Sequence, residues 1–465
     1  MVKPLLATAR GRRILRSLLP AVAALAAACD GNESPRADTV VLISIDTLRP
    51  DHLGCYGHDR PTSPAIDALA ASGVRFTDVA ASSPWTLPSH ASLLTGMYPS
   101  RHGVKDVVNT LRDGVPTLAG LLRERGWRTR AVVNSINVAA RYGLGTGFDS
   151  FAEVSEWVDP RNPAAGSRNA GGEVTDRGLR WLREAGDAPL FLFLHYYDVH
   201  TDYTPAPEYR ERFVGPYAGP VDGTTRQLLA FRSRRAPLSA ADVDHLRQLY
   251  DAEIAELDDQ LARLFAYLEE SGRSERALVV LTSDHGEEFL EHGSLLHGRT
   301  HFQELLAIPL VLAGPGVPAG RTYDAPSGLV DVAPTILGLL GLPVPEEVDG
   351  VDLSFAWRNP VRLPAERLLF SEADHNNAQP DIGRSIRLAR HKLILDRPTD
   401  RALLFDLAVD PGERTDLAAR EPRRAALLRE ALASFLAGER PGSAIEGPDE
   451  ELAAKLRAAG YADLR

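Results

Sequence analysis

The sequence has little cysteine, little positive charge and few long apolar runs. Its two cysteines, Cys29 and Cys55, cannot form a disulfide framework. With 52 Lys and Arg against 63 Asp and Glu, the formal net charge is −11, so no broad basic field exists to neutralise nucleic-acid phosphates. Beyond the N-terminal segment, no apolar run is long enough to span a bilayer. We therefore expect a globular protein with no nucleic-acid partner.

The N-terminal segment reads as a targeting signal. A basic head is followed by the short apolar stretch 18–28, which ends in small residues before Cys29. This pattern predicts a lipoprotein signal peptide over 1–29, with Cys29 as the lipidated residue; the alternative is a plain secretory signal cleaved nearby. We expect a polar tether over 30–38 and an exported protein, periplasmic or at the cell surface, that touches the membrane only through this anchor.

Strand-like apolar runs alternate with helical patterns along most of the chain, and they predict an α/β fold. The strand-like runs are 40–45, 129–133, 189–194 and 277–281. The helical patterns are 64–72, 117–125, 172–185 and 239–270. This rhythm implies a mostly parallel sheet with helices on both faces. Residues 150–170 and 204–240 show little periodicity and are predicted to be surface loops.

Two domains are predicted within the exported part. Residues 39–358 form the catalytic domain. Short strand patterns between 360 and 400 predict a small antiparallel subdomain, so 359–465 is assigned to that subdomain and a helical tail.

Two strand-like runs end in carboxylates, and a hydroxyl lies at a predicted helix start. Asp46 follows the run 39–45, and Asp284 follows 277–283. Between them, the Ser- and Pro-containing segment 82–96 runs into a helix start that presents Thr86, where free backbone N–H groups can face an anion. Carboxylates at strand ends next to such a hydroxyl predict a metal-assisted anion-transfer site. For each Asp the competing interpretation is a helix cap.

Four segments together resemble the sulfatase family of the alkaline-phosphatase superfamily. They are Ile45–His52, Thr86–His90 with Thr95–Gly96, Asp284–Glu287 and Leu404–Leu417, in the order the family has them. The resemblance covers roughly residues 38–420. It implies an alkaline-phosphatase-like central sheet flanked by helices, a small antiparallel C-terminal subdomain, and a hydrolase of sulfate esters.

The resemblance implies one divalent metal ion held by Asp46, Thr86, Asp284 and His285. Many family members carry Asn at the position of His285 and a second Asp at the position of Thr47. Imidazole suits manganese or zinc better than calcium, and calcium prefers six or more oxygen ligands. The metal therefore stays open among calcium, manganese and zinc.

Thr86 departs from the family pattern at the nucleophile. The family has Cys or Ser there, which is oxidised to formylglycine, and threonine cannot follow that route. A metal-bound threonine hydroxyl can still attack sulfur or phosphorus in line; the alternative is that Thr86 only caps the helix. Lacking the second hydroxyl of a formylglycine hydrate, Thr86 favours phosphoryl or phosphonyl transfer, whereas the overall resemblance favours sulfate esters.

Three histidines complete the predicted site. His90 stands where the family usually has Arg, and it either replaces that Arg as a donor or packs at the helix start. His200 and His297 resemble family histidines or lysines that contact the transferred group, and either could protonate the leaving oxygen. The alternative for both is a supporting position away from the reacting atoms.

Three functions remain open from the sequence. The first is a sulfatase acting on a sulfated or phosphorylated small molecule or glycan. The second is a phosphodiesterase, phosphonate monoester hydrolase or phosphotransferase on the same fold. The third is a non-catalytic lipoprotein that binds anionic glycans.

Overall fold

The computed structural model describes residues 37–154, 170–234, 237–358, 367–375 and 380–444. The chain divides into the units Met1–Ser34 and Pro35–Arg465, and the description below concerns the second unit. The predicted signal peptide, Cys29 and most of the predicted tether lie outside the described residues. Within the described ranges, no helix combines the length and the apolar character that a membrane span needs.

An eight-stranded sheet forms the centre of this unit. Its strand order is β12 (Arg321–Tyr323), β2 (Val74–Phe76), β11 (Leu310–Ala313), β8 (Ala277–Ser283), β1 (Thr39–Ile45), β7 (Leu190–Tyr196), β5 (Arg128–Val133) and β6 (Ser150–Glu153). Within this sheet only β11 is antiparallel to its neighbours, β8 and β2. The predicted mostly parallel sheet is therefore confirmed.

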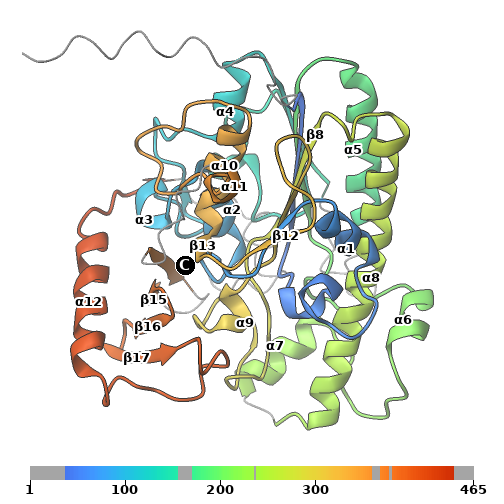
Figure 1. Cartoon of the computed structure of the whole chain (residues 1–465). Coiled ribbons are helices and arrows are strands. Elements are labelled where there is room, and N and C mark those ends of the chain that lie inside the picture. The colour runs from blue at the N-terminus through green and yellow to red at the C-terminus, as the bar shows by residue number, and fades with distance from the viewer. Residues whose placement is uncertain (1–36, 155–169, 235–236, 359–366, 376–379, 445–465) are drawn as a thin grey trace, which may run out of the picture. The chain divides into compact units, whose positions relative to one another are not determined.

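Helices cover both faces of the sheet. Alternate residues of β1 enter separate cores, with Val40 and Leu42 in one and Val41 and Ile43 in the other. The first core includes α2 (Thr86–Thr95), α4 (Leu118–Arg123) and α10 (Val332–Leu339). The second includes α1 (Pro64–Ala71), α5 (Gly171–Ala185) and α8 (Ala240–Glu270), of which α5 and α8 lie side by side (Figure 1). Both faces are apolar because both are buried.

A smaller antiparallel sheet follows in the chain. It consists of β14 (Leu368–His375), β15 (Pro380–Leu388), β16 (His391–Asp396) and β17 (Arg401–Asp406). The helix α12 (Pro422–Leu436) packs Leu428 and Leu432 into the core of this sheet. The predicted antiparallel C-terminal subdomain is confirmed, and β17 is an additional strand. The boundary between 358 and 359 stays a prediction, and 445–465 lie outside the described residues.

The prediction of surface loops over 150–170 and 204–240 is wrong in part. In the first range β6 joins the central sheet, and 155–169 lie outside the described residues. In the second range there are two helices. They are α6 (Pro207–Phe213) and α7 (Thr225–Arg234). The first begins at Pro207 and packs Phe213 against Ala252 and Ala255 of α8. A short helix that buries a single large side chain leaves too little periodicity to be recognised in sequence.

The remaining elements are short connections. They are η1 (Pro50–His52), η2 (Gly54–Tyr56), β3 (Val79–Ala80), α3 (Pro99–His102), β4 (Asn109–Thr110), η3 (Ala140–Tyr142), β9 (Glu288–Phe289), β10 (Leu295–Leu296), α9 (Gln303–Leu306), β13 (Ser327–Gly328), η5 (Leu329–Asp331), α11 (Phe355–Arg358) and β18 (Ser443–Ala444).

Candidate active site

The sheet brings Asp46 and Asp284 to one edge. β1 and β8 are neighbouring parallel strands in which Ile45 pairs with Ser283, so the next residue of each strand emerges at the same carboxyl end. Thr86 is the first residue of α2, and all three side chains are fully buried. Ligands of open α/β sheets bind at this edge.

Asp46, Asp284 and His285 form a compact cluster in which one ligand atom from each lies within 4.8 Å of the others. His285 Nε2 lies 3.3 Å from Asp284 Oδ2 and 3.8 Å from Asp46 Oδ1. Thr86 Oγ1 is 3.4 Å from the same nitrogen. His285 Nδ1 donates to the Gly286 carbonyl at 2.9 Å, which leaves Nε2 as the nitrogen whose lone pair can bind a cation.

The two carboxylates are costly to bury without a cation. Burial raises the pKa of Asp46, the charges of Asp284 and Glu287 raise it further, and the Thr86 side chain opposes the rise. Burial likewise raises the pKa of Asp284. Within the described part of the chain, both oxygens of Asp46 and Oδ2 of Asp284 have no hydrogen-bond partner. Orphaned buried oxygens of this kind fit a divalent cation, which would supply the missing positive charge.

Thr47 orients the cluster and turns its own hydroxyl away. Its backbone N–H donates to Asp284 Oδ1 at 3.2 Å, and its hydroxyl donates to the Val199 carbonyl at 3.3 Å. The Thr47 hydroxyl is therefore not directed at the carboxylates. Two carboxylates, one imidazole and one hydroxyl would together suit manganese or zinc better than calcium.

His90 lies beneath the cluster and is fully buried. Its Nδ1 donates to the Thr86 carbonyl at 2.8 Å and lies 3.4 Å from Asp284 Oδ2, while Nε2 accepts from the Ser44 hydroxyl at 3.0 Å. Burial lowers the pKa of His90, which agrees with a neutral ring. The geometry therefore suits positioning of Thr86 and Asp284 rather than contact with a substrate.

His195 also lies beside Asp46 and His90, and it was not identified as a site residue from the sequence. Its Nδ1 accepts from the Asn134 N–H at 3.3 Å, so the proton sits on Nε2, which lies 3.5 Å from Asp46 Oδ2. The ring packs edge-on against His90, with centroids 4.6 Å apart. The available signal was a polar side chain within the apolar run of β7, whose other residues are Leu, Phe and Tyr.

His297 and His200 lie on the other side of His285. The rings of His285 and His297 are 4.6 Å apart, and those of His297 and His200 are 4.9 Å apart. His200 Nδ1 donates to the Thr201 carbonyl at 2.7 Å, and burial lowers its pKa to about 3. The predicted site residues therefore form one connected group, in which the His200 ring packs against that of His297.

Glu287 fixes the orientation of His297. Its Oε1 accepts from His297 Nδ1 at 2.9 Å, and its Oε2 accepts from the Tyr203 hydroxyl at 2.9 Å. Glu287 is fully buried. Because Nδ1 carries the shared proton, Nε2 is the nitrogen left for contact with a substrate. Glu287 and Tyr203 were not predicted, since nothing in the sequence pairs them with His297.

Known proteins resemble this chain along most of its length. The family model described as Sulfatase matches residues 38–342. The chain is 24% identical to the Δ4,5-hexuronate-2-O-sulfatase of Bacteroides thetaiotaomicron, over 87% of this chain and 88% of the relative. It is 28% identical to human arylsulfatase A, over 86% of each.

Solved structures show the same fold. The phosphonate monoester hydrolase of Agrobacterium radiobacter superposes with a TM-score of 0.71 at 24% identity, over 86% of this chain and 96% of the other. A protein solved in complex with its substrate D-glucosamine-2-N,6-O-disulfate gives a TM-score of 0.71 at 20% identity, over 87% and 98%.

Proposed function

Because the chain belongs to the sulfatase family, we propose that it is a metal-dependent hydrolase of anionic esters whose nucleophile is the unmodified hydroxyl of Thr86. One observation carries the proposal. Thr86 Oγ1 lies 3.4 Å from His285 Nε2, within a cluster whose carboxylate oxygens have no hydrogen-bond partner in the described residues.

We propose Asp46, Asp284, His285 and Thr86 as the ligands of one divalent cation. When bound, such a cation supplies Lewis acidity and lowers the pKa of the hydroxyl group it holds. The start of α2 adds backbone N–H groups beside the anion, in a region where a helix favours negative charge.

The protein groups divide the chemistry as follows. As Thr86 Oγ attacks the sulfur or phosphorus atom in line, its proton passes to His297 Nε2, and the bond from the central atom to the ester oxygen breaks. His297 Nε2 gives that proton to the departing oxygen, with Glu287 holding the opposite ring nitrogen. Water then attacks the same central atom, its proton passes by the same nitrogen to Thr86 Oγ, and the bond between the central atom and Oγ breaks to restore the hydroxyl. His90 keeps Thr86 and Asp284 in register.

We propose a sulfate ester as the first substrate class, because the two relatives named above are a hexuronate sulfatase and an arylsulfatase. A specific feature favours a second class. A threonine adduct lacks the second hydroxyl of a formylglycine hydrate, so it cannot collapse to an aldehyde and must be opened by attack of water on sulfur or phosphorus. Phosphonate monoesters and phosphodiesters are therefore the second candidate, and the fold of a phosphonate monoester hydrolase is shared.

The two classes are separated by parallel turnover. We expect purified protein, reloaded with manganese or zinc, to hydrolyse an aryl sulfate, an aryl phosphodiester or an aryl phosphonate monoester. Thr86→Ala should lose at least about 10³-fold in kcat. Thr86→Ser should retain turnover because it keeps the hydroxyl, provided that its intact mass shows an unmodified serine. A rate on the phosphorus esters far above the sulfate rate would assign the second class.

The non-catalytic alternative has its own signature. If the wild-type protein turned over none of the three esters, held no cation, and bound an anionic glycan equally well as Thr86→Ala, the hydrolase proposal would be wrong.

We also propose export and lipid anchoring at Cys29, from the residue pattern before it. Detergent-phase partitioning of the full chain tests this. Cys29→Ser should move the protein into the aqueous phase, and equal partitioning of both forms would contradict the anchor.

A further inference from the structure

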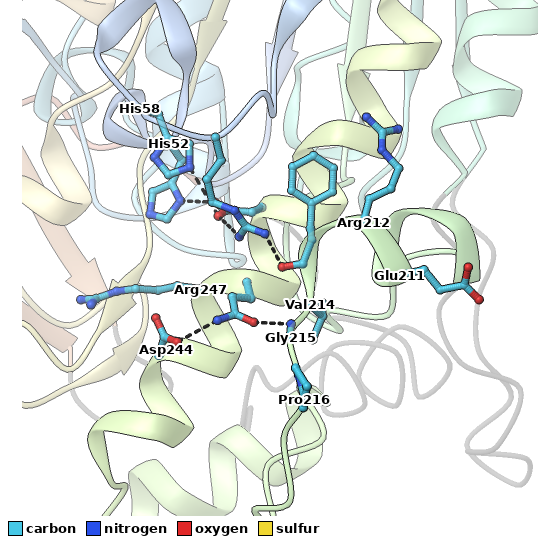
Figure 2. A pocket seen from close by; sticks show the side chains of 13 residues that line it. His52, His58, Glu211, Arg212, Val214, Gly215, Pro216, Asp244 and Arg247 are labelled. Atoms are coloured by element: carbon cyan, nitrogen blue, oxygen red, sulfur yellow. Dashed lines mark hydrogen bonds and ion pairs between the residues drawn. The ribbon is translucent and has the colours of Figure 1, made fainter.

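A second cluster of metal-ligating side chains lies apart from the site described above. It consists of His52 at the end of η1, His58, and Asp251 of α8, with one ligand atom from each within 4.8 Å of the others. All three line a cavity of about 710 Å³. Figure 2 shows the two imidazole rings next to each other on one wall of this cavity. We propose that these three residues bind a divalent transition-metal ion.

The spacing of the ligand atoms is close to what an ion requires. His52 Nδ1 lies 2.6 Å from Asp251 Oδ1, and His58 Nε2 lies 3.4 Å from Asp251 Oδ2. Around a tetrahedral zinc ion with bonds of about 2.0–2.1 Å, neighbouring ligand atoms are about 3.3 Å apart. The two ring centroids are 5.2 Å apart, near the roughly 5 Å expected for two imidazoles on one such ion. The His58–Asp251 spacing matches this value, whereas an ion can enter only if the His52–Asp251 hydrogen bond opens and its two atoms move about 0.7 Å further apart.

The donor set selects the kind of ion. Two imidazoles and one carboxylate are the ligands of open zinc and iron(II) sites, whereas magnesium and calcium prefer oxygen. His58 Nε2 is buried, lies 3.4 Å from Asp251 Oδ2 and makes no well-formed hydrogen bond within the described residues, so it offers a lone pair in the tautomer that carries the proton on Nδ1. A fourth position, open toward the cavity, would be filled by water.

Arg60 is the feature that most opposes a cation here. Arg60 Nη1 donates to Asp251 Oδ2 at 2.6 Å, and Arg60 Nη2 donates to the Phe213 carbonyl. A ligating carboxylate commonly uses one oxygen for the metal and accepts an outer hydrogen bond on the other. Asp251 can therefore hold the ion through Oδ1 and keep Arg60 on Oδ2. The nearby positive charge makes the site weaker than a closed structural zinc site.

A bound ion would join two parts of the fold. His52 and His58 flank η2 in the segment that follows β1, and Asp251 belongs to the long helix α8. The ion would fix this segment against α8 without touching Asp46 or Asp284. The inference therefore stands independently of the catalytic proposal.

The test uses the full chain with the catalytic ligands removed, as the double variant Asp46→Asn/Asp284→Asn. After chelator treatment and dialysis, zinc is titrated by calorimetry, and bound zinc is counted by elemental analysis. We expect one equivalent of zinc, and an added His58→Gln change should weaken binding by at least about 100-fold. His391→Gln is the matched control, because His391 also pairs with an Asp and is similarly exposed, at 15% against 17%.

A second measurement does not depend on a variant that must fold. Cobalt(II) added to the double variant should give visible absorption bands of a four-coordinate, imidazole-containing site, and zinc should abolish them. No zinc uptake by the double variant, or equal uptake with and without His58→Gln, would overturn the proposal and leave the cluster as an ion-pair network only.

Discussion

The charge repulsion between Asp46 and Asp284 gives a prediction that can be sized from the structure. Their ligand atoms lie within 4.8 Å of each other in a fully buried cluster. At that distance and an effective dielectric constant of about 20, two negative charges repel by about 3.5 kcal/mol. Asp46→Asn removes this repulsion and keeps the shape of the side chain. The variant should therefore be more stable than wild type when no cation is present.

A bound cation should make wild type more stable than Asp46→Asn. Wild type gains RT ln(1 + [M]/Kd), which is about 5.5 kcal/mol at a cation concentration of roughly 10⁴ times Kd. Asp46→Asn loses a ligand and gains much less. In a chain of this length, 3.5 kcal/mol corresponds to a shift of about 3–4 °C in Tm. Asp46→Asn should thus melt higher than wild type in chelator and lower in manganese or zinc.

Differential scanning calorimetry in one buffer, with chelator or with manganese or zinc, measures the Tm of both proteins in both conditions. Asp187→Asn serves as the control, since that side chain is 95% exposed and its substitution should change neither value. If Asp46→Asn melted below wild type in both conditions, the cluster would not be a site of uncompensated negative charge, and the ligand assignment would fail.

Three further predictions follow from other parts of the structure. Glu287→Gln should lower kcat about 10–100-fold with little change in KM, because it changes the hydrogen-bond partner of His297 Nδ1 and removes no substrate contact. An unchanged kcat would refute the role of Glu287 in positioning His297. Lys392→Met should lower the free energy of unfolding, measured in urea, by about 3–5 kcal/mol. Lys392 Nζ lies 2.8 Å from the buried Glu413, and its loss leaves that carboxylate without its ion-pair partner. A decrease of less than about 1 kcal/mol would contradict this. Burial raises the pKa of Asp258 to about 7, so the folded state binds the extra proton and the stability of wild type falls as the pH rises from about 4 to 7. Asp258→Asn should therefore gain stability relative to wild type over the same pH range, and a pH-independent difference in urea unfolding would show that the pKa of Asp258 is not raised.

The sequence determined the layered architecture because each signal for it is local. The short, continuous apolar run of β1 predicts a strand buried on both faces, and the 3.6-residue pattern of α8 predicts an amphipathic helix, so both elements are readable from sequence alone. Asp46, Asp284 and Thr86 were likewise accessible from sequence, since each stands directly at the end of a strand or the start of a helix. Parallel neighbouring strands then bring the two carboxylates to one edge.

Only the tertiary structure decided how the buried side chains pair. His195 approaches Asp46 because β7 lies beside β1, and Glu287 meets both His297 and Tyr203 across 10 and 84 residues of sequence. His52 and His58 meet Asp251 from 199 and 193 residues away, through the packing of α8. Such contacts depend on the register of strands and the docking of helices, which are set by the whole core and leave no periodic trace at the residues that make them.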